Sequence, residues 1–289
     1  MNPTVRFDSV DVVVNRNTLQ KLHTFAALKR SYRQFYLNLN VVGKTLFVSR
    51  MEQHAMERAR GGYGRNFENV FTSGDPAVMD AEGHHRVVRY DLGGLNVVVR
   101  LEADGYLGDE DLLASTGTVE SEGDTSRTPA PLNEFFLNLL QTVGLGSAAI
   151  AHHNPQHTHV IPRGTLVPHN SSLELKSNNA KPKAKEQIWF GRVPHVVFGR
   201  HDKGLISTVE RIDWQQEDFE AWAIKNQRSL RRLVWLLREI RRLVLERTDG
   251  KAVLVAMEKG SPLQVFPMKE GYGALPREVV ERFWDTGGK

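Results

Sequence analysis

Hydrophobic and polar residues alternate, or apolar residues form short runs, in many parts of this chain. A period of two is typical of strands, and it predicts strands at residues 5–14, 35–42, 45–49, 86–90, 95–104, 171–177, 194–199, 204–212, 252–257 and 263–266. Apolar residues recur at three- and four-residue steps from Leu230 to Val244, which predicts one long core helix. Shorter helices are expected near residues 15–25, 65–71, 132–143 and 184–190 and after Pro276. This order predicts an α/β (α+β) fold with a mixed central sheet flanked by helices.

The strand at residues 171–177 carries the first chemical signal of the chain. Because side chains alternate along a strand, Leu173 and Leu175 are expected in a core, while Glu174 and Lys176 share the other face. Nucleases of the PD-(D/E)XK type use such a pair. In them the carboxylate holds a hard divalent cation, and the lysine lies beside the attacked phosphate or the attacking water. Ordinary solvated strands have the same spacing, so the pair alone leaves both interpretations open.

A second acidic pair, Glu102 and Asp104, follows the apolar run at residues 95–99. Like charges on one face are unfavourable unless a cation or a proton lies among them. The two pairs therefore indicate either a shared cation site or two unrelated exposed strands.

The short helix at residues 65–71 is amphipathic, with Phe67, Val70 and Phe71 expected to point inward. Glu68 lies beside this apolar stripe. On the pattern alone, a single glutamate in this position is an ordinary surface residue.

Composition limits the class of protein. The chain has 289 residues, 40% of them hydrophobic, and we expect a single domain over residues 1–289. No run of about 18 apolar residues is present, so no membrane span or membrane partner is expected. The amino-terminal residues lack the apolar core of a signal peptide, which predicts an intracellular protein. Because the chain has no cysteine, carboxylates or histidines would have to hold any metal, and a hard, oxygen-ligated cation is the default.

Charge is unevenly distributed, although the formal net charge is only +4. Residues 102–124 contain eight acidic residues and neither lysine nor arginine, and the acidic stretch at 108–131 is expected to be a mobile loop. Basic residues gather from the end of the Glu-x-Lys strand onward: Lys176, Lys181, Lys183, Lys185, Arg192, Arg200 and Lys203. An acidic metal pocket rimmed by positive charge would suit a polyanionic substrate, and a solvated basic loop is the alternative.

Two further polar clusters have an ordinary explanation. Four histidines share one short segment: His152, His153, His157 and His159. A polar surface loop is favoured there over a zinc site, because no cysteine or patterned acid accompanies them. Arginines line the polar face of the long helix: Arg228, Arg231, Arg232, Arg238, Arg241 and Arg242. They could grip phosphates, but a solvated face with snorkelling side chains is favoured.

Short motifs occur in a common order from Val12 to Trp284. They are Arg16–Leu22, Thr45–Ser49, Gly64–Glu68, Glu102–Asp104, Glu174–Lys176, Gln187–Pro194 and Leu275–Pro276. In this order they resemble the motifs of the DXO/RAI-type decapping nucleases, a eukaryotic family of 5′-end RNA hydrolases. The resemblance implies a PD-(D/E)XK-like nuclease core. The segment before Arg16 is shorter, and the acidic stretch at 108–131 longer, than is usual in that family.

The resemblance also implies a divalent cation, Mg²⁺ or Mn²⁺. Asp104, Glu174 and the Leu175 carbonyl would bind it directly, with Glu102 close by and Glu68 partly through water.

Substrate contacts follow from the same resemblance. Lys176 and Gln187 would position the attacking water or the scissile phosphate, and Arg16 would hold a substrate phosphate. Arg192, in the same motif as Gln187, is a further candidate for substrate binding. The implied catalytic set is Glu68, Asp104, Glu174, Lys176 and Gln187.

The function implied is a metal-dependent hydrolase of RNA 5′ ends that removes incomplete, NAD-type or triphosphate caps, with 5′–3′ exoribonuclease activity in some members. Its RNA substrate, an exoribonuclease partner and a location in the nucleus or cytoplasm are further expectations. Two alternatives stay open: a PD-(D/E)XK-type nuclease acting on DNA, and a non-catalytic protein that stabilises an exoribonuclease. The complete acid, lysine and glutamine set argues against a purely passive role.

Overall fold

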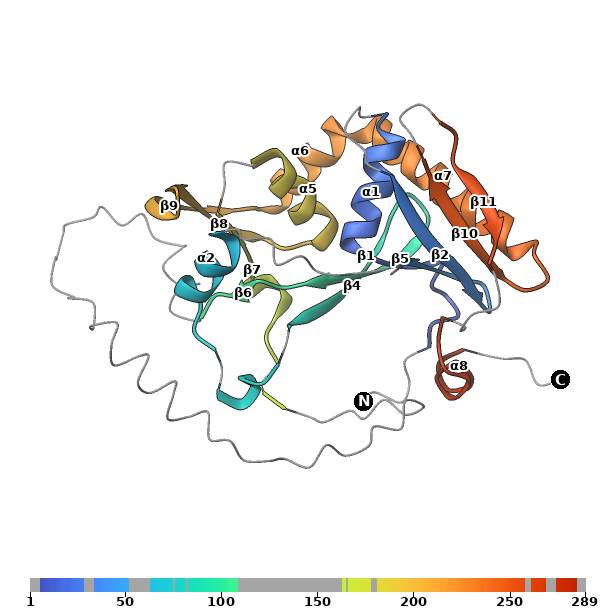
Figure 1. Cartoon of the computed structure of the whole chain (residues 1–289), viewed down its shortest axis with the longest axis horizontal. Coiled ribbons are helices and arrows are strands. Elements are labelled where there is room, and N and C mark those ends of the chain that lie inside the picture. The colour runs from blue at the N-terminus through green and yellow to red at the C-terminus, as the bar shows by residue number, and fades with distance from the viewer. Residues whose placement is uncertain are drawn as a thin grey trace, which may run out of the picture. The chain divides into compact units, whose positions relative to one another are not determined.

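The computed structural model describes residues 6–28, 34–51, 63–74, 76–81, 83–108, 163–164, 166–177, 181–257, 261–268 and 274–284. They all belong to one compact unit, composed of residues 1–108 and 163–289 (Figure 1). The helix expected at 132–143, the four-histidine segment and all but the first residue of the acidic stretch at 108–131 lie outside the described residues. The single domain over residues 1–289 and its mobile loop therefore stay predictions.

The larger of two sheets has seven strands in the order β11-β10-β2-β3-β1-β5-β4. Strand β1 lies between β3 and β5 and runs parallel to both. The other neighbouring strands are antiparallel, so the sheet is mixed as predicted. The strands are β1 (Val12–Asn15), β2 (Phe35–Val42), β3 (Thr45–Arg50), β4 (His85–Asp91), β5 (Asn96–Glu102), β10 (Lys251–Ala256) and β11 (Gln264–Pro267).

The smaller sheet has four strands in the order β6-β7-β8-β9. They are β6 (Gly105–Tyr106), β7 (Ser172–Lys176), β8 (His195–Asp202) and β9 (Leu205–Asp213). The pair β7–β8 is parallel, and the other two pairs are antiparallel. Since only two residues separate β5 from β6, the chain passes directly from the edge region of the first sheet into the second.

Helices cover these sheets: α1 (Arg16–Ala26), α2 (Tyr63–Phe71), α5 (Lys181–Gly191), α6 (Gln216–Lys225), α7 (Gln227–Leu245) and α8 (Arg277–Phe283). Short 3₁₀ turns lie at Pro76–Val78 and His169–Ser171. Helix α1 contacts both α7 and α5, and α2 contacts β7 (Figure 1). In the described part of the chain, each helix is too short or too polar to cross a lipid bilayer.

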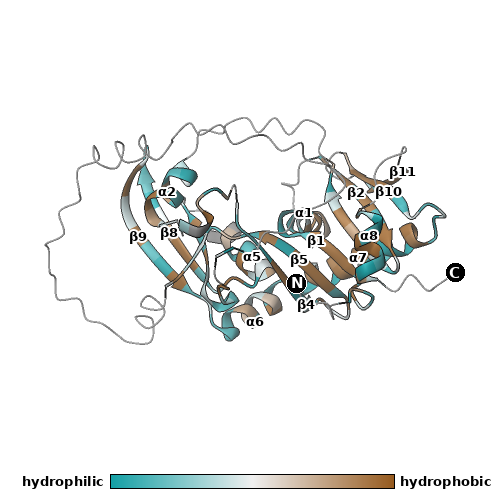
Figure 2. Ribbon diagram, turned by 90° about the horizontal axis from the view of Figure 1, so that it is seen from below, coloured by the Kyte–Doolittle hydropathy of each residue, from teal (hydrophilic) through white to brown (hydrophobic). Residues whose placement is uncertain are grey.

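The core confirms the helical pattern read from the sequence. The α7 stripe of Leu230, Leu233, Leu237, Ile240 and Val244 is buried. In Figure 2 the strands β2, β5 and β10 of the larger sheet are mostly hydrophobic, whereas β9, a largely exposed edge strand, is mixed. The large sheet and α7 therefore supply most of the apolar interior.

Two local predictions were wrong. Helix α2 buries only Phe67, while Val70 is 74% exposed and Phe71 is 43% exposed. This nine-residue helix contacts β7, and Phe67 packs on Gly199 of β8, but the described elements do not cover its stripe as far as Val70. The strand expected at 5–14 begins only at Val12, because residues 6–11 form a turn that pairs with the ends of other elements.

Candidate functional site

Glu174 is fully buried in β7, a central strand of the smaller sheet. A carboxylate without water is costly unless charged or polar groups surround it. Arg16 supplies one such group, because its Nη1 donates a hydrogen bond to Oε1 of Glu174. Arg16 is the first residue of α1 and directly follows β1, so this ion pair joins the larger sheet to the smaller one. The predicted alternative of a solvated strand pair is thereby excluded.

Lys176 lies on the same strand face as Glu174, as the alternation predicted. Its Nζ is 2.7 Å from Oε2 of Glu174 and 2.8 Å from Oδ2 of Asp104. Asp104, in the short link between β5 and β6, also accepts a 2.8 Å hydrogen bond from the Leu175 N–H. The link between β5 and β6 thus brings Asp104, the second acid of the Glu102–Asp104 pair, against β7.

The acidic side chains affect each other electrostatically. Burial and the charge of Asp104 raise the pKa of Glu68, and Glu102 adds to this while Lys176 opposes it. Burial and the charge of Glu174 likewise raise the pKa of Asp104 against the effect of Lys176. Glu68 therefore lies within electrostatic range of Asp104 and Glu102, and Asp104 lies within range of Glu174, although Glu102 itself is exposed.

In Glu174 and Lys176, the neighbouring charges outweigh the effect of burial on the pKa. Burial alone would raise the pKa of Glu174, but Lys176 and Arg16 hold it below its usual value. Burial alone would lower the pKa of Lys176, but Glu174 and Asp104 raise it. At neutral pH the centre of the site is therefore an ionised pair, with Asp104 and Glu68 as the more easily protonated acids at its edge.

The donor set suits a hard divalent cation, since it offers carboxylate and carbonyl oxygens rather than sulfur. Glu174 Oε2 is buried and lies 2.7 Å from Nζ of Lys176. However, in the described part of the chain no three acidic or histidine side chains are close enough to share one ion. Arg16 and Lys176 take up the carboxylate oxygens in this arrangement. The chemistry of these residues suits a cation. Their side chains would have to shift before they could bind one ion jointly.

Helix α2 is placed by one close contact. A Cβ atom added at Gly199 of β8 would lie 2.4 Å from a ring carbon of Phe67, so the buried ring rests directly on the backbone. Phe67 precedes Glu68, whose carboxylate is close enough to Asp104 for that charge to raise its pKa. Gly199 is visible in the sequence as a glycine within a predicted strand. Its partner, Phe67, lies 132 residues away, and a periodic pattern does not reveal such a contact.

The carboxyl-terminal end of α5 reaches the same site. A Cβ atom at Gly191 would lie 3.1 Å from Nη1 of Arg16. Gln187 is partly buried one turn earlier, and residues four apart share a helix face. Gln187 is thus on the side of α5 that faces Arg16.

Arg192 is placed differently from the other predicted residues. Its guanidinium carbon lies 4.5 Å from the ring centre of Tyr90 and 4.3 Å from that of Trp189. It lines a pocket of about 560 Å³, and none of the four carboxylates is among the described residues that line this pocket.

A buried polar chain was missed by the sequence analysis. His23 is fully buried, its Nδ1 lies 2.5 Å from Oε1 of Glu186, and its Nε2 lies 2.9 Å from Oγ of Ser229. These contacts tie α1 to α5 and α7. The available signal was a histidine within the apolar stripe of α1, between Leu22 and Ala26.

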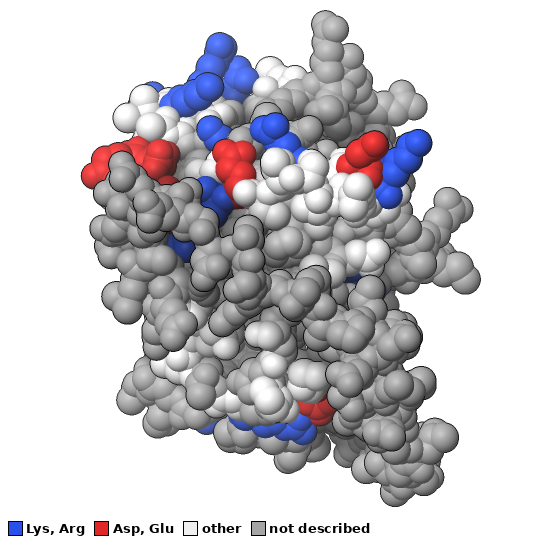
Figure 3. Space-filling view, turned by 90° about the vertical axis from the view of Figure 1, so that its left-hand side faces the viewer, with Lys and Arg blue, Asp and Glu red and all other residues white. Residues whose placement is uncertain are grey.

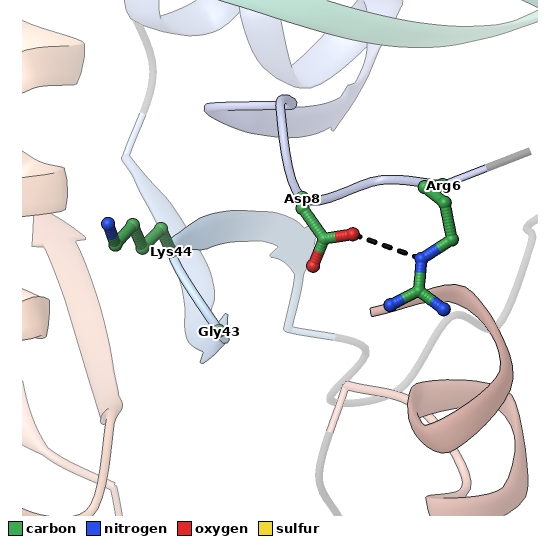
Figure 4. Close-up of a pocket in the computed structure, with 4 residues that line it drawn as sticks. All are labelled: Arg6, Asp8, Gly43 and Lys44. Atoms are coloured by element: carbon green, nitrogen blue, oxygen red, sulfur yellow. Dashed lines mark hydrogen bonds and ion pairs between the residues drawn. The ribbon is translucent and has the colours of Figure 1, made fainter. Parts of the chain in front are cut away.

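A larger pocket, of about 750 Å³, lies at the turn between β2 and β3. Figure 4 shows its lining by Arg6, Asp8, Gly43 and Lys44, with an Arg6–Asp8 ion pair of 3.1 Å. It contains none of the predicted site residues. The volume of a pocket alone therefore does not identify the reactive site of this protein.

The predicted positive rim is only partly visible. Figure 3 shows basic and acidic side chains side by side on the described parts of one face. Lys185, Arg200 and Lys203 are exposed. The described parts of this face are thus mixed in charge rather than uniformly positive.

Comparison with solved structures shows the fold. Rai1 of S. pombe in complex with 3′-FADP is similar with a TM-score of 0.53 at 14% identity, over 89% of this chain and 71% of that one. Candida albicans Rai1 in complex with pU5 and Mn²⁺ gives 0.52 at 14% identity, over 95% and 71%. K. lactis Dxo1 in complex with manganese gives 0.51 at 10% identity, over 95% and 69%. The predicted resemblance to the DXO/RAI-type family is therefore confirmed for the fold.

Sequence comparisons give a separate result. The model of a family described as a domain of unknown function (DUF8563) matches residues 1–284. No curated protein matches this chain significantly.

Proposed function

Because the chain belongs to the family described as a domain of unknown function (DUF8563), we propose its function from the site itself: hydrolysis of RNA 5′ ends, assisted by a divalent cation. The observation that carries this proposal is Lys176 Nζ between the carboxylates of Glu174 and Asp104. A fixed ammonium beside acidic oxygen ligands stabilises the negative charge that develops on a phosphate during hydrolysis.

Five groups would hold the cation: the Glu68, Glu102, Asp104 and Glu174 carboxylates and the Leu175 carbonyl. When bound, Mg²⁺ or Mn²⁺ supplies Lewis acidity and lowers the pKa of a water molecule. The similar structures of C. albicans Rai1 and K. lactis Dxo1 are complexes with manganese, which supports a divalent cation without choosing between these two metals. The buried Glu174 carboxylate, whose pKa is held low by Lys176 and Arg16, also supports this role.

The remaining residues would bind and orient the substrate. Arg16 would hold a phosphate, because a guanidinium matches two phosphate oxygens at once. A phosphate there would compete with Glu174 for Arg16 and so free a carboxylate oxygen. Gln187, on the same side of α5 as Gly191, would donate to the phosphate or to the attacking water.

The preferred substrate would be RNA with an incomplete, NAD-type or triphosphate 5′ end. The S. pombe and C. albicans structures hold 3′-FADP and pU5, so nucleotides bind those proteins of the same fold. An accompanying 5′–3′ exoribonuclease activity, an exoribonuclease partner and a nuclear or cytoplasmic location stay predictions.

One substrate panel tests the proposal. At fixed Mg²⁺ or Mn²⁺, purified protein is given NAD-capped, guanosine-capped, triphosphate and monophosphate RNA, together with matched DNA. We expect hydrolysis of at least one RNA 5′ end and its loss in Asp104→Asn. The control Asp8→Asn removes an exposed carboxylate outside the site and should keep full activity. Preference for DNA would instead support a general nuclease, and no hydrolysis of any substrate would support a non-catalytic role.

A further inference from the structure

Four parts of the described chain line the second pocket. They are the end of β4 with Asp91 and the turn after it, the end of α5 with Trp189 and Arg192, Ala223 of α6, and one face of α7. Gln227, Arg231, Trp235 and Arg238 are spaced four, four and three residues apart on that helix, so they share this face. We call it the aromatic–arginine pocket. Its volume of about 560 Å³ is in the range of small-ligand sites.

Arg192 is held in place before any ligand binds. Its backbone φ of 54° lies in the left-handed region, which is uncommon for a residue other than glycine and is maintained only by its surroundings. Tyr90 and Trp189 contact the face of its guanidinium. Such stacking leaves the N–H groups at the guanidinium edge able to donate.

Asp91 lines the same pocket as Arg192, but it does not form an ion pair with that guanidinium. Among the described residues no carboxylate forms an ion pair with it. The neighbouring Asp91 instead accepts hydrogen bonds from the Gly94 N–H at 3.0 and 3.1 Å. Burial lowers the pKa of Arg192, but an arginine stays protonated. A partly buried cation of this kind favours an anionic ligand.

Trp235 offers a flat apolar surface beside these cations. It is 66% exposed, although large aromatic residues are usually buried. Arg231 lies one turn before it on α7, and Arg238, about one turn after it, donates a 2.8 Å hydrogen bond to the Gly93 carbonyl. Exposed aromatic rings together with arginines are the combination that binds single-stranded nucleic acid, because bases stack and phosphates pair.

The pocket and the acidic site are approached by adjacent residues at the end of α5. Gly191 approaches Arg16 in the acidic site, and the next residue, Arg192, lines the pocket. A polymer whose end lies at Arg16 could therefore reach the pocket by passing this corner. An acidic peptide would also meet the arginines, but it would not need the exposed Trp235 ring.

We propose that the aromatic–arginine pocket binds one nucleotide of single-stranded RNA downstream of the 5′ end, with the phosphate on Arg192 and Arg231 and the base on Trp235. This inference rests on the proposed function only for the identity of the polymer. Binding and hydrolysis are separate measurements, so either idea can fail without the other.

Binding is tested with 5′-hydroxyl, 3′-fluorescein-labelled RNA of about 10 nucleotides and the full chain in EDTA, so that no cation-dependent hydrolysis occurs. We expect Trp235→Ala and Arg231→Ala each to weaken binding on the order of tenfold. Arg231→Ala should also reduce the slope of log affinity against log salt by about one. Arg228→Ala is the matched control, because this exposed arginine of the same helix does not line the pocket.

Two outcomes would overturn the proposal. One is equal affinity of wild type, Trp235→Ala and Arg231→Ala for the RNA, or losses no larger than that of Arg228→Ala. The other is competition by a poly-glutamate peptide as effective as that by unlabelled RNA, which would assign the pocket to acidic peptides. Hydrolysis of a nucleoside triphosphate, which has no downstream nucleotide, should be unaffected by Trp235→Ala, and this reports on the acidic site alone.

Discussion

Lys176 Nζ donates a 2.8 Å hydrogen bond to Oδ2 of Asp104, although the two residues are 72 positions apart in the sequence. The same ammonium lies 2.7 Å from Glu174, so one cation separates two acids that would otherwise repel each other. Lys176 therefore has two possible effects, on the charge of the reacting phosphate and on the availability of the carboxylate oxygens. The two acids and the lysine should respond differently to substitution.

Lys176→Ala should lower kcat on the order of 10² or more, because the lost stabilisation of developing charge acts in the transition state. Cation affinity should stay the same or increase, since Lys176 competes for oxygens of Asp104 and Glu174. Asp104→Ala should instead abolish both cation binding and hydrolysis. Single-turnover hydrolysis and calorimetric titration with Mn²⁺ separate these effects. Rapid hydrolysis by Lys176→Ala on every 5′ end would show that this lysine is structural.

Glu68→Gln should make the protein more stable at pH 7 while reducing hydrolysis. The pKa of Glu68 is raised in the folded state by burial, Asp104 and Glu102, so its ionised form is disfavoured there. A raised carboxyl pKa costs stability above the unfolded pKa, and this cost disappears as the pH falls below it. Thermal melts at pH 7 and pH 3.5 measure the difference. The variant should melt higher than wild type at pH 7 and show a smaller advantage at pH 3.5, and a lower melting temperature at pH 7 would contradict the prediction.

The sequence predicted those features that repeat along the chain. The buried stripe of α7, the strands β2 and β3 and the shared face of Glu174 and Lys176 all follow from periods of 3.6 or 2. They need no knowledge of distant partners. The candidate acids came from the same reasoning together with the family resemblance.

Features that depend on contacts between distant segments were not predicted. Arg16 is 158 positions from Glu174, and His23 is 163 positions from Glu186. Neither pairing leaves a periodic trace. The exposure of Val70 has the same origin, because an apolar stripe is buried only where another element covers it. Arg192 belongs to the predicted Gln187–Pro194 motif. Its backbone is left-handed, however, and its side chain lines a pocket other than the acidic site.

The pH dependence of stability should depend on Glu174. Arg16 and Lys176 hold its folded pKa below the ordinary value of 4.5, so its stabilisation is present above about pH 4.5 and is lost as the pH falls through the folded pKa. Glu174→Gln should therefore show a shallower loss of unfolding free energy on acidification below pH 4.5 than wild type. Urea unfolding between pH 3 and pH 7 provides the comparison. Parallel curves for the two proteins would show that this ion pair does not contribute to acid sensitivity.

The buried chain of His23, Glu186 and Ser229 should stabilise the packing of three helices. His23→Ala removes a ring from the core and a polar partner of buried Glu186, which should cost about 2–4 kcal/mol of unfolding free energy. His85→Ala, at an exposed position of β4, is the control and should change stability by less than about 0.5 kcal/mol. Urea unfolding at pH 7 measures both. A change in His23→Ala as small as in the control would mean that the chain is energetically neutral.

Gly199→Ala should disturb the site from a distance. The new methyl group would meet the Phe67 ring at 2.4 Å, and a ring packed in the core cannot withdraw as a flexible chain end can. The ring must move, and α2 with it, at a cost of about 1–3 kcal/mol. Because Glu68 follows Phe67, its carboxylate should move away from Asp104, and cation affinity should fall together with stability.

Gly64→Ala is the control in the same helix. The nearest neighbour of the added Cβ would be Ser177 Oγ at 3.6 Å, an ordinary contact, so alanine should be tolerated and should support the helix. If Gly199→Ala destabilises the protein but leaves Mn²⁺ affinity at the level of Gly64→Ala, then the position of α2 does not control the acidic site.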